Sequence, residues 1–212
     1  MSTKANDDLD LTARYLEENA IKKLQIGCGP NLLQGWLNSD YLPKSRDVIH
    51  LDAKGSYPFE EGTFDYIFCE HVIEHVPFGK GVMMLTETLR ILKSGGKVRI
   101  STPDLAFLMN IMSHSDTNIH KRYIKWATDT FISGVPSYQP AFVLNNFVRA
   151  WGHEFIYDEP TLRAAFTCAG FREIQRFPIS ISDDVDLCNL ENEKRMPDGF
   201  LALESMILEG TK

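Results

Sequence analysis

The sequence predicts an α/β fold with a largely parallel sheet, and three observations support this class. Short apolar runs recur along the chain without strict alternation of polar and apolar residues, which is typical of strands covered on both faces. A segment with helical spacing separates two of these runs, as in a βαβ unit. Finally, the apolar run at residues 24–26 leads directly into a Gly-x-Gly turn at residues 27–29.

The first half of the chain is expected to form one helix followed by five strands. The helix covers residues 7–19, and its apolar side holds Leu9, Leu11, Tyr15 and Leu16. The predicted strands cover residues 22–28, 36–41, 47–53, 64–70 and 97–103. The gaps between the first three strands are short for helical crossovers, so either turns replace the helices there or the strand bounds differ from these.

The βαβ unit lies between the fourth and fifth predicted strands. Apolar residues repeat there at helical spacing, at Val82, Leu85, Leu89 and Leu92. Gly95-Gly96 is expected to end this helix in a left-handed conformation. The crossover should be right-handed and the two strands parallel.

The second half begins with a mainly helical, aromatic-rich segment at about residues 105–157. A helix is predicted over residues 159–169, with Asp158 as its N-cap and Gly170 at its exit. Two final strands are expected at residues 171–178 and 200–208. The acidic loop between them, residues 183–198, is long for a hairpin and is expected to be mobile or functional.

Composition excludes several classes of protein. The chain has 212 residues, enough for one domain over residues 1–212, and its net charge of −7 argues against a broad nucleic-acid interface. It contains no apolar run long enough to span a membrane and no apolar segment of the signal-peptide kind. The cysteines form no C-x-x-C pair. We therefore expect a cytoplasmic protein with free thiols.

The Gly-x-Gly turn and two aspartates predict a site for an adenosine-containing cofactor. Gly27 and Gly29 allow the backbone to approach a ligand closely. Asp40 and Asp52 each follow a short apolar run, and an aspartate at a strand end can bind the hydroxyls of a ribose. A nicotinamide dinucleotide is disfavoured because Leu32 occupies the position of the third glycine.

Four motifs in order resemble the class I S-adenosyl-L-methionine (SAM)-dependent methyltransferases, including a subgroup of small predicted methyltransferases of the type 11 kind. They are Leu-Gln-Ile-Gly-Cys-Gly at 24–29, Gly-Trp-Leu-Asn-Ser-Asp at 35–40, Asp52 followed by residues 57–67 and 70–76, and Glu-Thr-Leu-Arg-Ile-Leu-Lys-Ser-Gly-Gly-Lys-Val at 87–98. Gln25 and Asn31 depart from the common pattern, which has an acidic residue and a third glycine there.

The resemblance implies a Rossmann-like, seven-stranded, mostly parallel sheet in the order 3-2-1-4-5-7-6, with strand 7 antiparallel and helices on both faces. It implies SAM as cofactor and S-adenosyl-L-homocysteine (SAH) as product. The helical segment at about 105–157 would then cover the acceptor site, and the helix around Tyr15 is a candidate lid over the cofactor. Relatives suggest a small-molecule or glycan-type acceptor. The acidic charge balance makes nucleic acid an unlikely acceptor, and no membrane partner is expected.

The resemblance also assigns the candidate site residues. The cofactor residues would be Gly27, Cys28, Gly29, Asn31, Asp40, Asp52, Ala53 and Glu70. If the acceptor is a hydroxyl, a base must take its proton. The candidates are His71, His75, His153 and Asp104, with His71 first because the fourth strand ends at the reaction centre in this fold.

Two alternatives remain open at this point. The absence of a decisive catalytic constellation is compatible with a SAM-binding, non-catalytic partner subunit. His71-x-x-Glu74-His75 also matches a zinc-protease signature, since two histidines one helical turn apart can share a metal. Because this segment directly follows a predicted strand, we assign no metal ligand and keep the zinc hydrolase as the lesser alternative.

Overall fold

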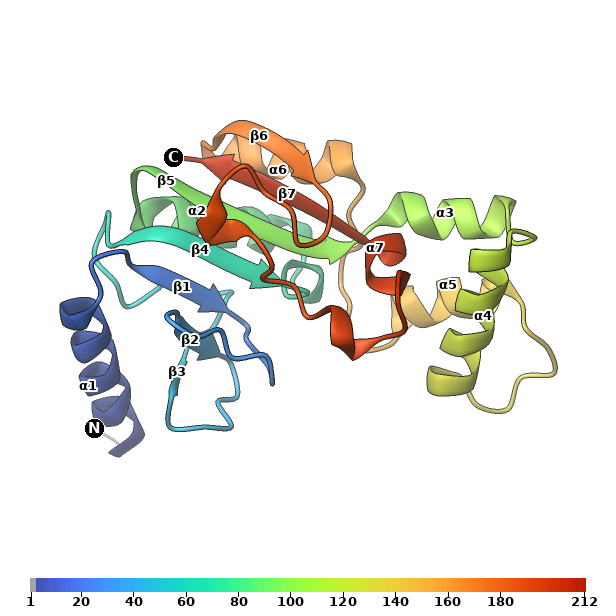
Figure 1. Ribbon diagram of the computed structural model, residues 1–212, viewed down its shortest axis with the longest axis horizontal. Coiled ribbons are helices and arrows are strands. Elements are labelled where there is room, and N and C mark those ends of the chain that lie inside the picture. Colours follow the sequence, from blue (N-terminus) through green and yellow to red (C-terminus); the bar gives the residue numbers. More distant parts are fainter. Residues whose placement is uncertain (1–2) are drawn as a thin grey trace.

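Seven strands form one sheet in the computed structural model, which describes residues 3–212 (Figure 1). The strand order is β3-β2-β1-β4-β5-β7-β6. Neighbouring strands from β3 to β5 are parallel, whereas β7 is antiparallel to both β5 and β6. This confirms the order that the resemblance implied. The strands are β1 (Lys23–Ile26), β2 (Leu37–Asp40), β3 (Val48–His50), β4 (Phe64–Glu70), β5 (Leu92–Pro103), β6 (Arg172–Phe177) and β7 (Ser205–Thr211).

Helices connect the later strands, and α2 packs against α6 on one face of the sheet (Figure 1). None of the helices in the described part of the chain is long and apolar enough to cross a membrane. The helices are α1 (Thr3–Glu18), α2 (Phe78–Ile91), α3 (Leu105–Ser113), α4 (Asn118–Phe131), α5 (Pro140–Arg149), α6 (Glu159–Ala169) and α7 (Phe200–Glu204); the 3₁₀ turns are η1 (Ile73–His75), η2 (Val185–Leu187) and η3 (Glu193–Arg195).

Turns, not helices, join the first three strands, as their short spacing predicted. α1 lies beside β3, and Tyr15 on this helix is buried. The Tyr15 hydroxyl accepts a hydrogen bond from Lys23 N at 2.8 Å and donates one to Gly35 O at 3.1 Å. Both partners lie at the amino ends of strands. This part of α1 therefore fastens the amino end of the sheet. Nearer the start of the helix, Asp8 accepts from His50 N at the carboxyl end of β3, and the lid over the cofactor stays a prediction.

The segment between β6 and β7 crosses the other face of the sheet (Figure 1). Leu187 and Leu190 in this segment form a small apolar cluster with Trp36 and Phe68. It is therefore packed rather than mobile. This long segment contains two 3₁₀ turns and no α-helix before α7, and it covers the face that helices would cover if the β1–β2 and β2–β3 connections were longer.

Arg99 on β5 anchors this covering segment, and its side chain is fully buried. The guanidinium donates to Glu191 Oε1 at 2.6 Å and to Glu209 Oε1 at 2.6 Å. It also donates to the carbonyl oxygens of Ile181 and Pro178. A buried charge is tolerated only when it is paired and hydrogen-bonded, and these partners meet that need.

Two boundary predictions are wrong. Helix α2 ends at Ile91, and Gly95 lies inside β5 with φ of 78°, where the β4–β5 register shifts. The glycines therefore allow an irregularity in the strand instead of ending the helix. The stretch predicted as a strand from residue 200 begins instead with the short helix α7. One helical turn buries both Phe200 and Leu201, and β7 starts only at Ser205.

A second apolar core lies beyond the carboxyl end of β5. It joins α3, α4 and α5, and Phe200 of α7 packs into it. These helices project past the end of the sheet (Figure 1). By contrast, α6 forms as predicted: the Asp158 side chain accepts from Thr161 N, and Gly170 ends the helix with φ of 104°. The helical insertion thus stands at the edge where open α/β folds bind ligands.

Candidate active site

The Gly-x-Gly turn after β1 forms the first wall of a cleft at the carboxyl edge. Gly27 has φ of 69°, and a Cβ at this position would lie 2.2 Å from Val72 Cγ2. Gly29 has φ of 51°, and a Cβ there would meet nothing within 4 Å. A positive φ is readily adopted only by glycine. The two glycines therefore have different roles: Gly27 allows close packing against the segment after β4, and Gly29 borders open space.

Asp40 ends β2 and faces the same cleft. Its Oδ2 accepts from Gly29 N at 2.9 Å, and its Oδ1 accepts from Leu42 N at 2.9 Å. These bonds fix the carboxylate while each oxygen keeps a further lone pair. The cleft has a volume of about 290 Å³ and is lined by Ile26, Gly27, Gly29, Asp40, Tyr41, Leu51, Ala53, His71, Val72 and His75.

Four of the predicted cofactor residues lie outside this lining. The first two belong to turns near the cleft. Asp52 is exposed, and its Oδ1 accepts from Lys54 N at 2.9 Å. Cys28 is buried, and burial, followed by the nearby Asp40 charge, raises the pKa of its thiol to about 11. The raised pKa disfavours the thiolate, which is the reactive form of cysteine.

The other two contact the segment that covers the sheet. Asn31 Nδ2 donates to Leu190 O at 3.4 Å. Glu70 accepts from Asn192 N at 3.3 Å, lies 3.9 Å from Arg195, and has its pKa raised by burial. Tyr41, Leu51 and Val72 line the cleft without having been predicted, because ordinary apolar and aromatic residues carry no sequence signal for a ligand.

The segment after β4 does not form the helix that the zinc signature requires. His71 has φ of 53°, and only η1, one 3₁₀ turn, follows it. His71 Nε2 lies 3.0 Å from Ser205 Oγ, and its Nδ1 lies 3.2 Å from Glu74 Oε1. Both ring nitrogens thus have partners. The structure holds His71 between β7 and Glu74 and not beside His75 on a helical face.

Glu74 is fully buried at the floor of the site. Its Oε2 accepts from Thr102 Oγ1 at 3.1 Å, whereas its Oε1 has no well-aligned hydrogen bond. Burial opposes ionisation of Glu74, but the interaction with His71 outweighs burial and lowers the pKa of the carboxyl. The site therefore contains a buried carboxylate with one oxygen that is poorly satisfied.

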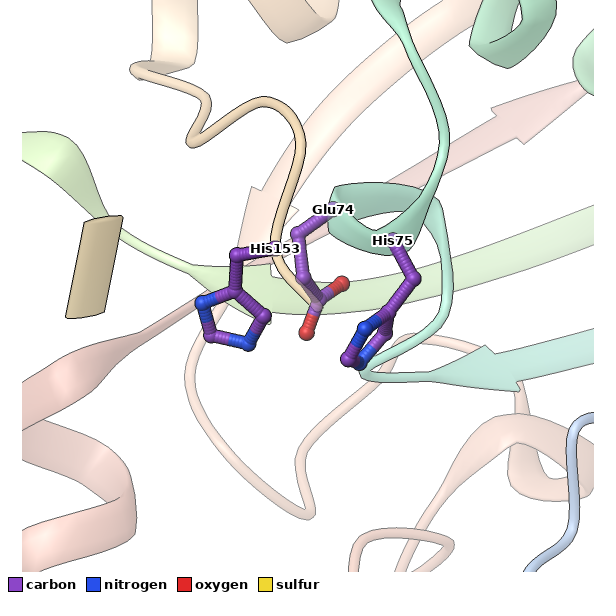
Figure 2. A group of neighbouring side chains, drawn as sticks. All are labelled: Glu74, His75 and His153. Carbon is purple, nitrogen blue, oxygen red and sulfur yellow. The ribbon is translucent and has the colours of Figure 1, made fainter. Parts of the chain in front are cut away.

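His153 approaches this carboxylate from the loop between α5 and α6. The rings of His75 and His153 lie 4.9 Å apart in an edge-to-face arrangement. Phe147 O lies 2.7 Å from His153 Nδ1, and burial lowers the pKa of His153, which favours the neutral ring. Figure 2 shows Glu74, His75 and His153 converging, so two of the predicted base candidates, His75 and His153, lie together. Asp104, a further base candidate, is instead the N-cap of α3 and the ion-pair partner of Arg176.

A second cavity, of about 380 Å³, opens between this floor and the helical insertion. Its walls are mainly aromatic, and Trp151 stacks edge-to-face with both Phe131 and Phe147. It is lined by His71, Glu74, His75, Pro103, Tyr123, Trp126, Ala127, Phe131, Val143, Asn146, Phe147, Trp151, His153, Arg195, Met196 and Glu204. His71 and His75 line both cavities and therefore form their shared wall.

The polar groups of this cavity include three that the sequence did not indicate: Asn146, Arg195 and Glu204. The Tyr123 hydroxyl donates to the Glu204 carboxylate. Burial raises the pKa of Glu204, and burial followed by the Glu204 charge raises that of Tyr123. The cavity thus combines aromatic faces with a small number of fixed polar groups, as ligand sites commonly do.

Comparisons with known proteins agree with this arrangement. Residues 24–100 match the family described as methyltransferase domain. A search of curated protein sequences finds no match. The strand order and the match over residues 24–100 agree with a methyltransferase domain of Rossmann-like fold.

Several solved structures share the fold. A SAM-dependent methyltransferase from Archaeoglobus fulgidus has 13% identity and a TM-score of 0.53, with 100% of this chain and 95% of that chain covered. A possible exported protein from Bordetella parapertussis has 12% identity and a TM-score of 0.56, with coverages of 98% and 67%. Phosphoethanolamine N-methyltransferase 2 from Haemonchus contortus, in complex with phosphomonomethylethanolamine and SAH, has 16% identity and a TM-score of 0.52. This chain is 98% covered and spans 52% of that protein.

Proposed function

We propose that this protein transfers a methyl group from SAM to a hydroxyl of a small-molecule or glycan-type acceptor in the aromatic cavity. The observation that carries the proposal is the shared wall formed by His71 and His75. A methyl donor in the glycine cleft and an acceptor in the aromatic cavity would meet at this wall. Aromatic faces also suit the apolar faces of sugars and small ring compounds.

The cleft residues fit SAM. The open space beside Gly29 can receive the methionine portion, with backbone N–H groups of the turn nearby. Asp40 keeps free lone pairs for the ribose hydroxyls, and Ala53 provides a small surface for the adenine. When bound, SAM supplies a methyl group on a positively charged sulfur that is already activated for displacement. Much of the rate then comes from positioning the acceptor.

His71 is the proposed general base, and Glu74 is its positioning residue. With Nδ1 facing the buried carboxylate, the ring is held in the tautomer whose Nε2 can accept a proton. Ser205 Oγ occupies that acceptor position in the structure, 3.0 Å from Nε2. An acceptor hydroxyl that replaces the serine contact would lose its proton to His71 as the methyl group transfers.

The test compares His71→Gln with the unchanged protein in SAH release from SAM over a panel of sugars and small hydroxyl compounds. Loss of a general base should lower turnover by about 10²–10⁴-fold, while SAH binding stays normal. Turnover that is undiminished in the variant would remove His71 from the role of base. If the unchanged protein binds SAH normally but turns over no acceptor in the panel, a non-catalytic partner subunit would be favoured instead.

A further inference from the structure

We propose that Glu74, His75 and His153 bind a divalent transition-metal cation at the floor of the aromatic cavity. Each residue offers one ligand atom, and these atoms all lie within 4.8 Å of one another (Figure 2). This set replaces His71 of the zinc signature with His153, which lies 78 residues after His75 in the sequence. The role of the metal in acceptor binding rests on the proposed methyl transfer, but the site itself does not.

Glu74 is the strongest reason to expect a cation here. The carboxylate is fully buried, and its Oε1 faces His71 Nδ1 at 3.2 Å without a well-aligned hydrogen bond. A poorly satisfied buried carboxylate oxygen is costly, and a cation would offset that cost. Thr102 holds Oε2 and so fixes the plane in which Oε1 is presented.

The two histidines are suitably arranged as neutral nitrogen ligands. The Phe147 carbonyl lies at hydrogen-bond distance from His153 Nδ1, so that Nδ1 carries the proton and Nε2 is left with its lone pair. A hydrogen bond of this kind to a backbone carbonyl is the usual way in which metal-binding histidines are oriented. The His75 ring makes no hydrogen bond to a described residue and contacts the His153 ring. It is therefore free to turn toward the metal.

The distances require only a modest closure. Ligand atoms around a tetrahedral cation lie about 3.3 Å apart, because each metal–ligand bond is about 2.0–2.2 Å long. The separations of up to 4.8 Å would shrink by at most about 1.5 Å. A rotation of the His75 side chain changes its own two separations, and closure between Glu74 and His153 requires a movement of those side chains as well.

Two imidazoles and one carboxylate favour Zn²⁺, Co²⁺ or Mn²⁺ over Ca²⁺ or Mg²⁺, which prefer oxygen ligands. Three protein ligands leave at least one coordination position open. All three residues line the aromatic cavity, so that position faces the proposed acceptor. A hydroxyl bound there would have a lowered pKa. Its proton would pass to His71, its oxygen would bond to the methyl carbon, and the carbon–sulfur bond of SAM would break to give neutral SAH.

The experiment measures metal binding directly and needs no acceptor. The chelator-treated protein is titrated with Co²⁺, followed by visible absorption, and with Zn²⁺, followed by equilibrium dialysis and metal analysis. We expect one cation per chain. His153→Ala and His75→Asn should each weaken binding by at least the ten- to hundredfold typical of outer-shell changes. His114→Ala removes an exposed histidine outside the cluster and should bind like the unchanged protein.

Two results would overturn the proposal. One is the absence of Co²⁺ and Zn²⁺ binding at roughly 100 micromolar metal, which corresponds to a weak dissociation constant. The other is equal affinity in His153→Ala and the unchanged protein. SAH binding is measured in the same samples by thermal unfolding. Metal binding without an SAH effect would contradict the proposed methyl transfer and leave the metal site in place. An SAH effect without metal binding would remove the metal site and leave the proposed methyl transfer in place.

Discussion

The carboxylate of Asp40 accepts the backbone N–H of Gly29 at 2.9 Å, which ties the end of β2 to the glycine turn after β1. Gly29 and Asp40 both line the glycine cleft, where Asp40 is proposed to hold the ribose of SAM. The bond therefore connects the shape of the turn with the proposed binding of the ligand. Substitution should affect cofactor binding more than it affects folding, since the residue is only partly buried.

Asp40→Ala is therefore predicted to abolish stabilisation by SAH. In the unchanged protein, SAH at a hundred times its dissociation constant should add about 2.7 kcal/mol, or roughly 5–10 °C in Tm. Thermal unfolding with and without SAH measures the difference. Asp47→Ala, an exposed aspartate in the next turn, is the matched control and should keep the full shift. An undiminished shift in Asp40→Ala would contradict the assignment.

Gly27→Ala should close the cleft. The added methyl group would lie 2.2 Å from Val72 Cγ2, and φ of 69° is already unfavourable for alanine. We expect loss of SAH binding by calorimetry together with a lower Tm. Gly35→Ala imposes the same kind of backbone strain at φ of 78°, but its Cβ would meet nothing within 4 Å. If both variants lose SAH binding equally, strain and not the Val72 contact is responsible.

Arg99→Met should destabilise the protein strongly, by about 3–5 kcal/mol, because it leaves the buried carboxylates of Glu191 and Glu209 without their cation. Chemical denaturation measures the change in free energy of unfolding. The same substitution at Arg163, which is more exposed and pairs with Glu159 on one helix, should cost no more than about 1 kcal/mol for its ion pair. Similar losses at the two positions would show that Arg99 does not anchor the covering segment.

Glu87 gives a prediction about pH. Its hydrogen bond to Arg90 is the largest effect on its carboxyl and lowers the pKa from its usual value of 4.5. The contribution of Glu87 to stability is thus fully present above pH 4.5 and is lost as the pH falls through the lower folded-state pKa.

Glu87→Gln should accordingly be less stable than the unchanged protein at pH 7, and the difference should shrink on acidification below pH 4.5. Urea denaturation at a series of pH values measures this difference. A gap between the two proteins that stays constant down to the acid limit would mean that the Arg90 contact does not depend on the Glu87 charge.

Much of the sheet could be predicted from the sequence because its signals are local. β4 covers the predicted residues, and α6 has the predicted cap and exit glycine. The order of the strands came from the resemblance and not from these signals. The start of β7 was missed because an apolar run of nine residues gives no local indication of whether its first turn is helical.

The candidate site could be predicted only in part. Gly27, Gly29, Asp40 and Ala53 line the cleft because turns at strand ends carry recognisable residues. Asn31 and Glu70 meet the segment between β6 and β7, and no local pattern shows where a segment more than a hundred residues away will pack. The approach of His153 to Glu74 could not be predicted from local sequence either, because it depends on the loop after α5 reaching the floor of the cavity.

The position of β7 between β5 and β6 has a consequence for how the chain matures on the ribosome. Until residues 205–211 emerge, β5 has one open edge and β6 has no partner in the sheet. Open strand edges can pair with other chains, so the nascent protein is most prone to aggregate in this interval. Ser205, the first residue of β7, also contacts His71. β7 follows the other six strands of this sheet in the chain, so its arrival both closes the sheet and provides the contact to the proposed base, and a nascent chain that stops before β7 has neither.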